Sequence, residues 1–67
     1  MLNNLRNVLY SKGIRTKTFA DYLGVSEKTA ENKIKEITAF TYPEFKKVCS
    51  LLPEYNADYI FKSDTRQ

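Results

Sequence analysis

The stretch FADYLGVSEKT, Phe19–Thr29, decides the fold of this chain. Ala20 is small enough to let a neighbouring helix approach closely, and Gly24 adopts a positive φ at little cost. Val25 can fill the corner between two helices, and Ser26 is a preferred helix N-cap. The spacing therefore predicts two helices that meet at a steep angle around a short turn.

Apolar residues on both sides of this turn recur with the period of amphipathic helices. The pattern predicts a helix over 2–12 that ends at a left-handed Gly13. It predicts a second helix over 17–23 with Thr16 as its cap, and a third that begins at Ser26 and continues toward Ile37. The residues expected on the inward faces of these helices are Leu2, Leu5, Val8, Leu9, Phe19, Tyr22, Leu23, Ala30, Ile34 and Ile37.

The stretch FTYPEF, 40–45, carries the clearest helix start. Thr41 and Glu44 have the spacing of a capping box, and Phe40 and Phe45 have that of a hydrophobic staple. Pro43 is tolerated in a first helical turn. A last short helix follows Asn56. The fold class expected is all-α, a compact five-helix domain over 1–62 with a disordered tail over 63–67.

Composition limits the chemistry that the chain can perform. It has 67 residues, no histidine and one cysteine, Cys49, which falls at a helical core position. Histidine is the commonest general base and metal ligand, so we expect no enzyme, no cofactor and no metal site. The apolar runs are far shorter than the ~20 residues that cross a bilayer, so we expect no membrane partner and a cytoplasmic location.

The positive charge lies in the first half of the chain. Residues 1–35 hold seven basic and three acidic side chains, a net charge of +4, whereas residues 36–67 hold four basic and five acidic ones, a net charge of −1. A basic half on a small domain indicates nucleic-acid binding. Ordinary solvation of the surface is the alternative reading.

The order and spacing of these signals resemble the lambda-repressor-like helix-turn-helix family, the phage Cro and repressor type. The stretch TKTFADYLGVSEKTAENKI, 16–34, is similar to its helix-turn-helix, with Ala20, Gly24 and Ser26 at matching positions. ITAFTYPEFKKVCSLL, 37–52, is similar to its fourth helix, and NADYIF to its closing turn. Lys35-Glu36 stands where the family often has Asn-Gly, which is why we expect the third helix to continue toward Ile37.

The resemblance implies a DNA-reading face on the third helix. On a helical wheel Lys28 and Asn32 lie opposite the inward residues, where lysine can reach guanine and asparagine can pair with adenine. The other expected base contacts are Thr29 and Glu27, of which Glu27 would accept from a cytosine amino group. The expected DNA backbone contacts are Arg15, Thr16, Lys17, Ser26, Lys35, Thr38 and Thr41. Solvation of the outward face and helix capping by the threonines are the alternatives.

These expectations combine into a function. The chain is expected to be a sequence-specific double-stranded DNA-binding protein, a Cro-like phage or prophage transcription regulator that occupies an operator. A homodimer on DNA is expected, with Tyr55 and Tyr59 in its interface, unless both tyrosines only cover the core of one monomer. The alternative function is a protein-interaction module of the same fold, a partner of a repressor or toxin.

Overall fold

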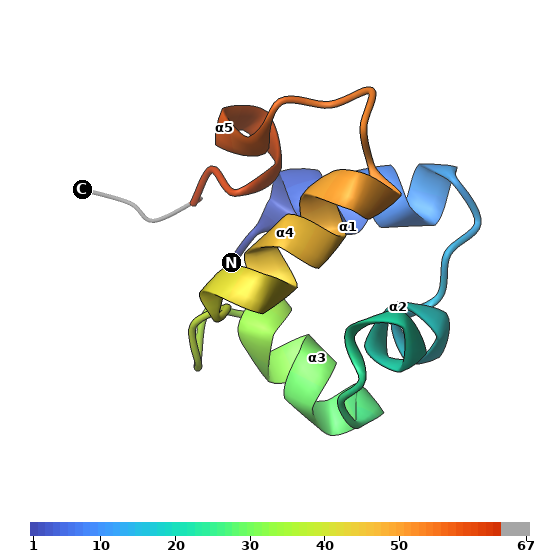
Figure 1. The fold of residues 1–67 in the computed structure, drawn as a ribbon, viewed down its shortest axis with the longest axis vertical. Helices are drawn as coiled ribbons and strands as arrows, with labels where there is room; N and C mark the ends of the chain where they lie inside the picture. The colour runs from blue at the N-terminus through green and yellow to red at the C-terminus, as the bar shows by residue number, and fades with distance from the viewer. Residues whose placement is uncertain (64–67) are drawn as a thin grey trace.

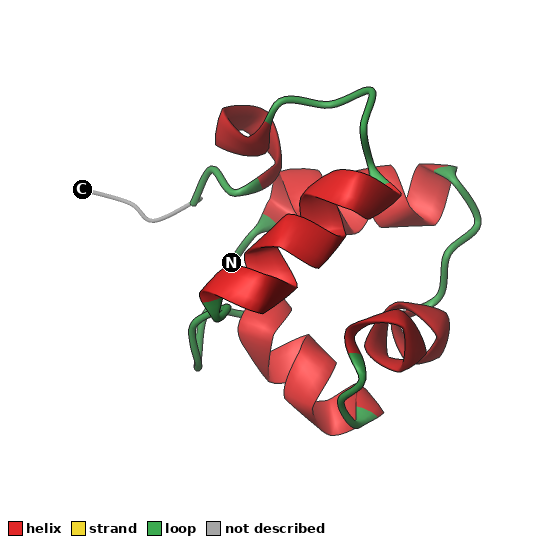
Figure 2. Cartoon of the chain, viewed as in Figure 1, coloured by secondary structure: helices red, strands yellow, loops and turns green. Residues whose placement is uncertain are grey.

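The computed structural model describes residues 1–63 and contains five helices: α1 (Asn3–Ser11), α2 (Thr16–Leu23), α3 (Glu27–Ile34), α4 (Tyr42–Leu51) and α5 (Ala57–Ile60). No strand occurs in this described part of the chain, which confirms the all-α prediction (Figures 1 and 2). In Figure 1, α4 crosses the middle of the molecule between α5 and α3, and α2 is seen nearly end-on beside α3. Of the predicted tail over 63–67, only Ser63 lies within the described residues.

The predicted stripe of α1 lies in the core. Its four apolar members, Leu2, Leu5, Val8 and Leu9, are at most 4% exposed. The helix ends with a left-handed residue, because Gly13 has a φ of +73°. The Gly13 N–H donates to the carbonyl of Tyr10, and the Ile14 N–H donates to that of Leu9 at 2.8 Å. This pair of bonds is a Schellman motif, which satisfies carbonyls that the helix end would leave unpaired.

The turn between α2 and α3 is built as its residues predicted. Gly24 has a φ of +79°, and the Val25 N–H donates to the carbonyl of Ala20 at 3.0 Å. Ala20 is 1% exposed, so its small side chain permits the close packing of α2 against α3. The Ser26 hydroxyl accepts from the Thr29 N–H at 3.1 Å and caps α3. The two helices therefore meet around a turn whose backbone groups are paired locally.

The prediction of a Thr16 cap for α2 was wrong. Thr16 is itself the first helical residue, and the N-cap position belongs to Arg15, whose φ and ψ are extended. No side chain caps this end of the helix. The first-turn N–H groups of α2 are therefore left for solvent or a ligand.

The prediction that the third helix continues toward Ile37 was also wrong. It ends at Ile34, and Glu36 takes a φ of +67° where glycine is the usual choice. The Ile37 N–H donates to the carbonyl of Asn32 at 2.9 Å and the Glu36 N–H to that of Lys33 at 3.1 Å, so this end is a Schellman motif like that of α1. Ile37 consequently turns outward and is 66% exposed; Tyr22, the other misplaced inward residue, is 42% exposed.

Long-range contacts hold Glu36 in this conformation. Its Oε1 accepts from the Met1 amino group at 2.9 Å and from the Ser63 hydroxyl at 2.7 Å. These bonds lower the pKa of Glu36, the amino-terminal group being the largest cause. The Leu2 N–H adds a bond to the carbonyl of Ile34 at 2.9 Å. Met1, Leu2 and Ser63 thus all contact the end of α3.

The capping box of α4 is confirmed. The Thr41 hydroxyl accepts from the Glu44 N–H at 3.3 Å, and the Glu44 carboxylate accepts from the Thr41 N–H at 2.9 Å. The two staple residues each pack on a third ring, since Phe61 lies 5.3 Å from Phe40 and 4.9 Å from Phe45 between ring centroids. The start of α4 is therefore tied to the residue that follows α5.

A buried ion pair joins α3 to α4. Lys33 is 7% exposed, and its Nζ lies 2.9 Å from Oε1 of Glu44, the same oxygen that accepts from Thr41. Lys33 also donates to the carbonyl of Ala39 at 2.9 Å. Burial raises the pKa of Glu44, but the Thr41 N–H and the Lys33 ammonium outweigh it, and the net shift is downward. Lys33 is thus a structural residue, although it contributed to the basic charge of the sequence.

Two variants of Glu36 test the left-handed end of α3. Glu36→Gly and Glu36→Ala lose the same side-chain contacts, but only alanine keeps a Cβ at positive φ. The glycine variant is expected to be about 1 kcal/mol more stable than the alanine variant. Urea denaturation measures the difference. Alanine as the more stable variant, which is the order inside a helix, would show that α3 continues past Glu36.

The pH dependence of unfolding tests the buried pair. A carboxyl group whose folded-state pKa is depressed stabilises the fold above its usual pKa of 4.5 and loses this effect as the pH falls through the folded-state value. The stability gap between wild type and Glu44→Gln should be wide at pH 7 and shrink below pH 4.5. Urea melts across this range measure it. Glu54→Gln, which removes an exposed pair with Lys12, is the control and should leave a small gap throughout.

Candidate nucleic-acid interface

The outward face of α3 carries polar and basic side chains. Ala30, Lys33 and Ile34 are buried, and the opposite side presents Lys28 and Lys35, both exposed, with the half-buried Asn32. Within residues 1–63 the Asn32 side chain makes no hydrogen bond, so its amide is available to a ligand. The helical wheel therefore placed these three residues on the correct face.

Acidic side chains flank this face. Glu31 pairs with Lys35 at 2.9 Å, and the hydrogen bond from Lys35 is the largest cause of a lowered pKa at Glu31. Glu27 is exposed and lies in the first turn of α3, where its charge suits the helix dipole. Thr29 is half-buried, and its hydroxyl oxygen accepts from the Ser26 hydroxyl at 2.9 Å. Of the four candidates for base contacts, Lys28 and Asn32 thus form no ion pair or hydrogen bond through their side chains within residues 1–63.

The expected backbone-contact residues divide into two groups. Ser26 and Thr41 are helix caps whose hydroxyl oxygens already accept from backbone N–H groups. Arg15 and Lys17 are exposed, and Thr16 is half-buried at the uncapped start of α2. Thr38 is exposed in the loop between α3 and α4. The residues at the start of α2 are therefore more available for contact with a phosphate than the two capping hydroxyls.

The basic residues of the first half differ in whether they pair with a carboxylate of the same chain. Of the seven in residues 1–35, three pair with carboxylates: Lys12 with Glu54, Lys33 with Glu44 and Lys35 with Glu31. The four without an ion pair among the described residues are Arg6, Arg15, Lys17 and Lys28. Arg6 was not among the predicted site residues, because its position on α1 gave no sequence signal of proximity to α3.

A recess of about 370 Å³ brings Arg6 to the start of α2. It is lined by Arg6 and Tyr10 from α1, by Arg15 and Thr16, and by Glu31 from α3. Tyr10 is 86% exposed. Two segments that are separate in sequence, α1 and the start of α2, therefore present two guanidinium groups beside α3.

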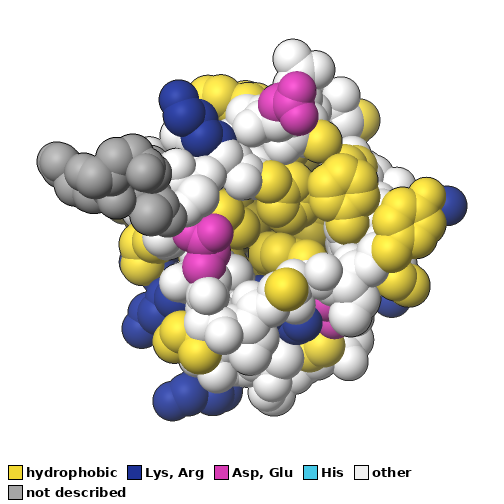
Figure 3. Space-filling model, turned by 90° about the vertical axis from the view of Figure 1, so that its left-hand side faces the viewer, with side chains coloured by type: hydrophobic (Ala, Val, Ile, Leu, Met, Phe, Trp, Pro, Cys, Tyr) yellow, Lys and Arg dark blue, Asp and Glu magenta, His cyan; other side chains and the backbone are white. Residues whose placement is uncertain are grey.

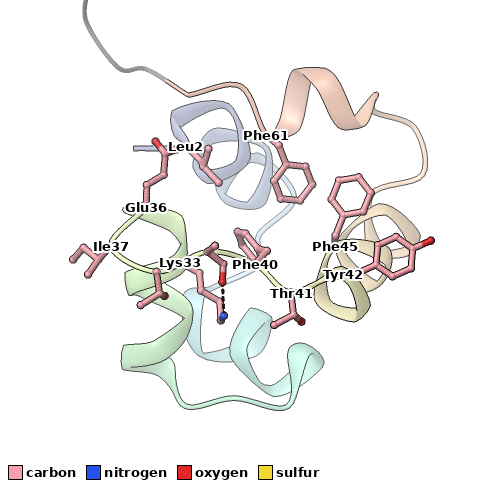
Figure 4. A pocket seen from close by; sticks show the side chains of 11 residues that line it. Leu2, Lys33, Glu36, Ile37, Phe40, Thr41, Tyr42, Phe45 and Phe61 are labelled. Carbon is pink, nitrogen blue, oxygen red and sulfur yellow. Dashed lines mark hydrogen bonds between the residues drawn. The ribbon is translucent and has the colours of Figure 1, made fainter.

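A second, larger groove of about 750 Å³ is apolar. Leu2, Phe40, Phe45 and Phe61 line it, and Figure 3 shows the hydrophobic hollow on this face of the molecule. Figure 4 shows the rings of Phe40, Phe45 and Phe61 around the groove, with the Lys33 bond to the Ala39 carbonyl below them. Tyr42, 71% exposed, adds apolar surface at the edge. This groove shares no lining residue with the recess.

The predicted interface tyrosines contact each other within one chain. The rings of Tyr55 and Tyr59 are stacked, with centroids 6.1 Å apart and planes at 17°. Tyr55 is half-buried against the core, whereas Tyr59 is 48% exposed. The apolar groove was not predicted as a surface, because its residues were assigned to the core or to the α4 staple.

Residues 1–63 contain neither a metal-binding cluster nor a membrane-spanning helix. This part of the chain contains no group of three or more cysteine, aspartate or glutamate side chains placed to hold a metal ion. None of its helices has the length and apolar character needed to cross a membrane. No family model, curated protein or solved structure matches this chain.

Proposed function

We propose that this chain is a non-enzymatic, sequence-specific double-stranded DNA-binding protein. In this proposal α2, the Gly24 turn and α3 form a helix-turn-helix of the lambda-repressor-like type, and α3 enters the major groove. The chain would then act in the cytoplasm as a Cro-like regulator of phage or prophage origin that occupies an operator and blocks polymerase.

One observation carries this proposal. The basic side chains of residues 1–35 that form no ion pair with another described residue, Lys28 among them, lie on α1, at the start of α2 or on the outward face of α3. Lys28 and Asn32 supply the types of donor and acceptor that read base edges. Arg15 and Lys17 supply charges suited to phosphates. This division of roles is typical of DNA-binding proteins.

A second candidate function is supported by the apolar groove. Leu2, Phe40, Phe45 and Phe61 form a concave apolar surface with Ile37 and Tyr42 exposed at its edge. Exposed apolar surface of this kind is typical of protein-binding sites. A module that binds a repressor or a toxin would use this surface and would bind duplex DNA weakly.

The proposal includes a homodimer on DNA. One recognition helix reads only a few base pairs, and proteins of this size gain specificity by pairing across a two-fold axis. Tyr59 keeps 48% of its surface exposed and is available to a partner protomer, while Tyr55 supports it from the core side. Pairing there would leave α3 free for the groove.

Substitutions on α3 and α2 are expected to have different effects. Lys28→Ala and Asn32→Ala should each cost about 1–3 kcal/mol on a site selected from random duplex DNA and should relax base preference, whereas Lys17→Ala should weaken binding about equally on all sequences. Fluorescence anisotropy on selected and scrambled duplexes measures both effects, with circular dichroism as the folding control. Wild-type affinity in a folded Asn32→Ala variant would show that the reading face is wrongly assigned.

Stoichiometry tests the dimer. Two protomers should bind a full pseudo-palindromic site cooperatively, with half-site centres about 34–36 Å apart. Sedimentation of the protein with a full site and with an isolated half-site measures the number bound to each. One protomer bound with equal affinity to both duplexes would rule out the dimer.

A further inference from the structure

We propose that Arg6 and Tyr10 of α1 belong to the DNA-binding surface, and that with Arg15 and Thr16 they hold one phosphate of the duplex backbone in the recess beside α3. This inference rests on the proposed function, and it adds a third element, α1, to a surface otherwise built from α2 and α3.

The charges of the recess favour an anion. Arg6 and Arg15 line the same recess of about 370 Å³, and neither has an ion pair among residues 1–63. Glu31 is the one carboxylate among the lining residues; it pairs with Lys35 at 2.9 Å, and its pKa is lowered mainly by Lys35 and to a lesser extent by Arg6. Two like charges that share a recess repel each other, and a bound phosphate would relieve that repulsion.

The donors of the recess suit a phosphodiester. A guanidinium group presents its N–H donors as a planar fork that matches two phosphate oxygens. The Tyr10 and Thr16 hydroxyls add neutral donors, and Tyr10 is exposed enough to turn toward a ligand. Both kinds of side chain commonly contact the DNA backbone.

The position of the recess suits the backbone of a duplex that lies along α3. Glu31, which lines the recess, directly precedes Asn32 on α3, and it pairs with Lys35, a residue of the outward face. Base edges read by Lys28 and Asn32 are bordered by phosphates on each side of the major groove. The recess therefore lies at the edge of the reading face, where a phosphate is expected.

The salt dependence of binding to a random-sequence duplex tests this inference, because phosphate contacts do not depend on sequence. Each phosphate that a cation neutralises contributes about 0.9 to the slope of log affinity against log salt concentration. Arg6→Gln should therefore lower the slope by up to about 0.9, because Arg15 still contacts the same phosphate, and Arg6→Lys should restore the slope. Tyr10→Phe should weaken binding with no change of slope, because it removes a neutral donor.

Lys47→Gln is the matched control, since it removes one charge from an exposed position on α4 outside the recess. A slope for Arg6→Gln that equals the slope for Lys47→Gln, in a wild type that binds with a steep slope, would overturn the recess but leave the proposed function standing. No salt-dependent binding by the wild type would overturn both. All variants change exposed side chains, and circular dichroism checks their folding.

Discussion

The ion pair between Lys33 and Glu44 is the contact on which the arrangement of α3 and α4 depends. One carboxylate oxygen accepts from the Thr41 N–H and from Lys33, and Lys33 in turn holds the carbonyl of Ala39. The side chains of the two charged residues are only 9% and 14% exposed, so removal of one partner would leave a poorly solvated charge, at a cost of about 3–5 kcal/mol. The Glu44 carboxylate therefore both caps α4 and joins α4 to α3.

This ion pair helps to determine which side of α3 faces outward. Because its inner side is fixed by Ala30, Ile34 and the buried Lys33, its outer side is fixed as the one that carries Lys28 and Asn32. The left-handed Glu36 then ends the helix and turns the chain toward α4. A rigid, outward polar face is what the proposed reading of base edges requires, since donors must be held in register with the groove.

The apolar groove and the charged recess are separate surfaces with no lining residue in common, so a substitution in one leaves the lining of the other unchanged.

Much of the candidate site could be predicted, because helical periodicity places side chains on faces without knowledge of their neighbours. Lys28, Asn32 and Lys35 lie on the expected side of α3. Their contact with DNA stays a prediction. Arg6 could not be found in this way, since only the packing of α1 beside α2 and α3 brings it to Arg15. Lys33 was counted as surface charge, and only its depth and its distance to Glu44 assign it to the core.

The sequence by itself determined the elements whose signals are local. Ser26, the Thr41–Glu44 capping box, Gly13 and Gly24 act within a few residues, and the helix boundaries near them were predicted closely. Only the tertiary structure decided the end of α3, because Glu36 holds a left-handed conformation through contacts with Met1 and Ser63. Ile37 faces outward for the same reason, since it follows the left-handed Glu36. Local signals fixed the starts of α3 and α4 and the ends of α1 and α2, whereas the end of α3 depended on contacts between distant residues, because a left-handed conformation costs a residue other than glycine about 1–2 kcal/mol.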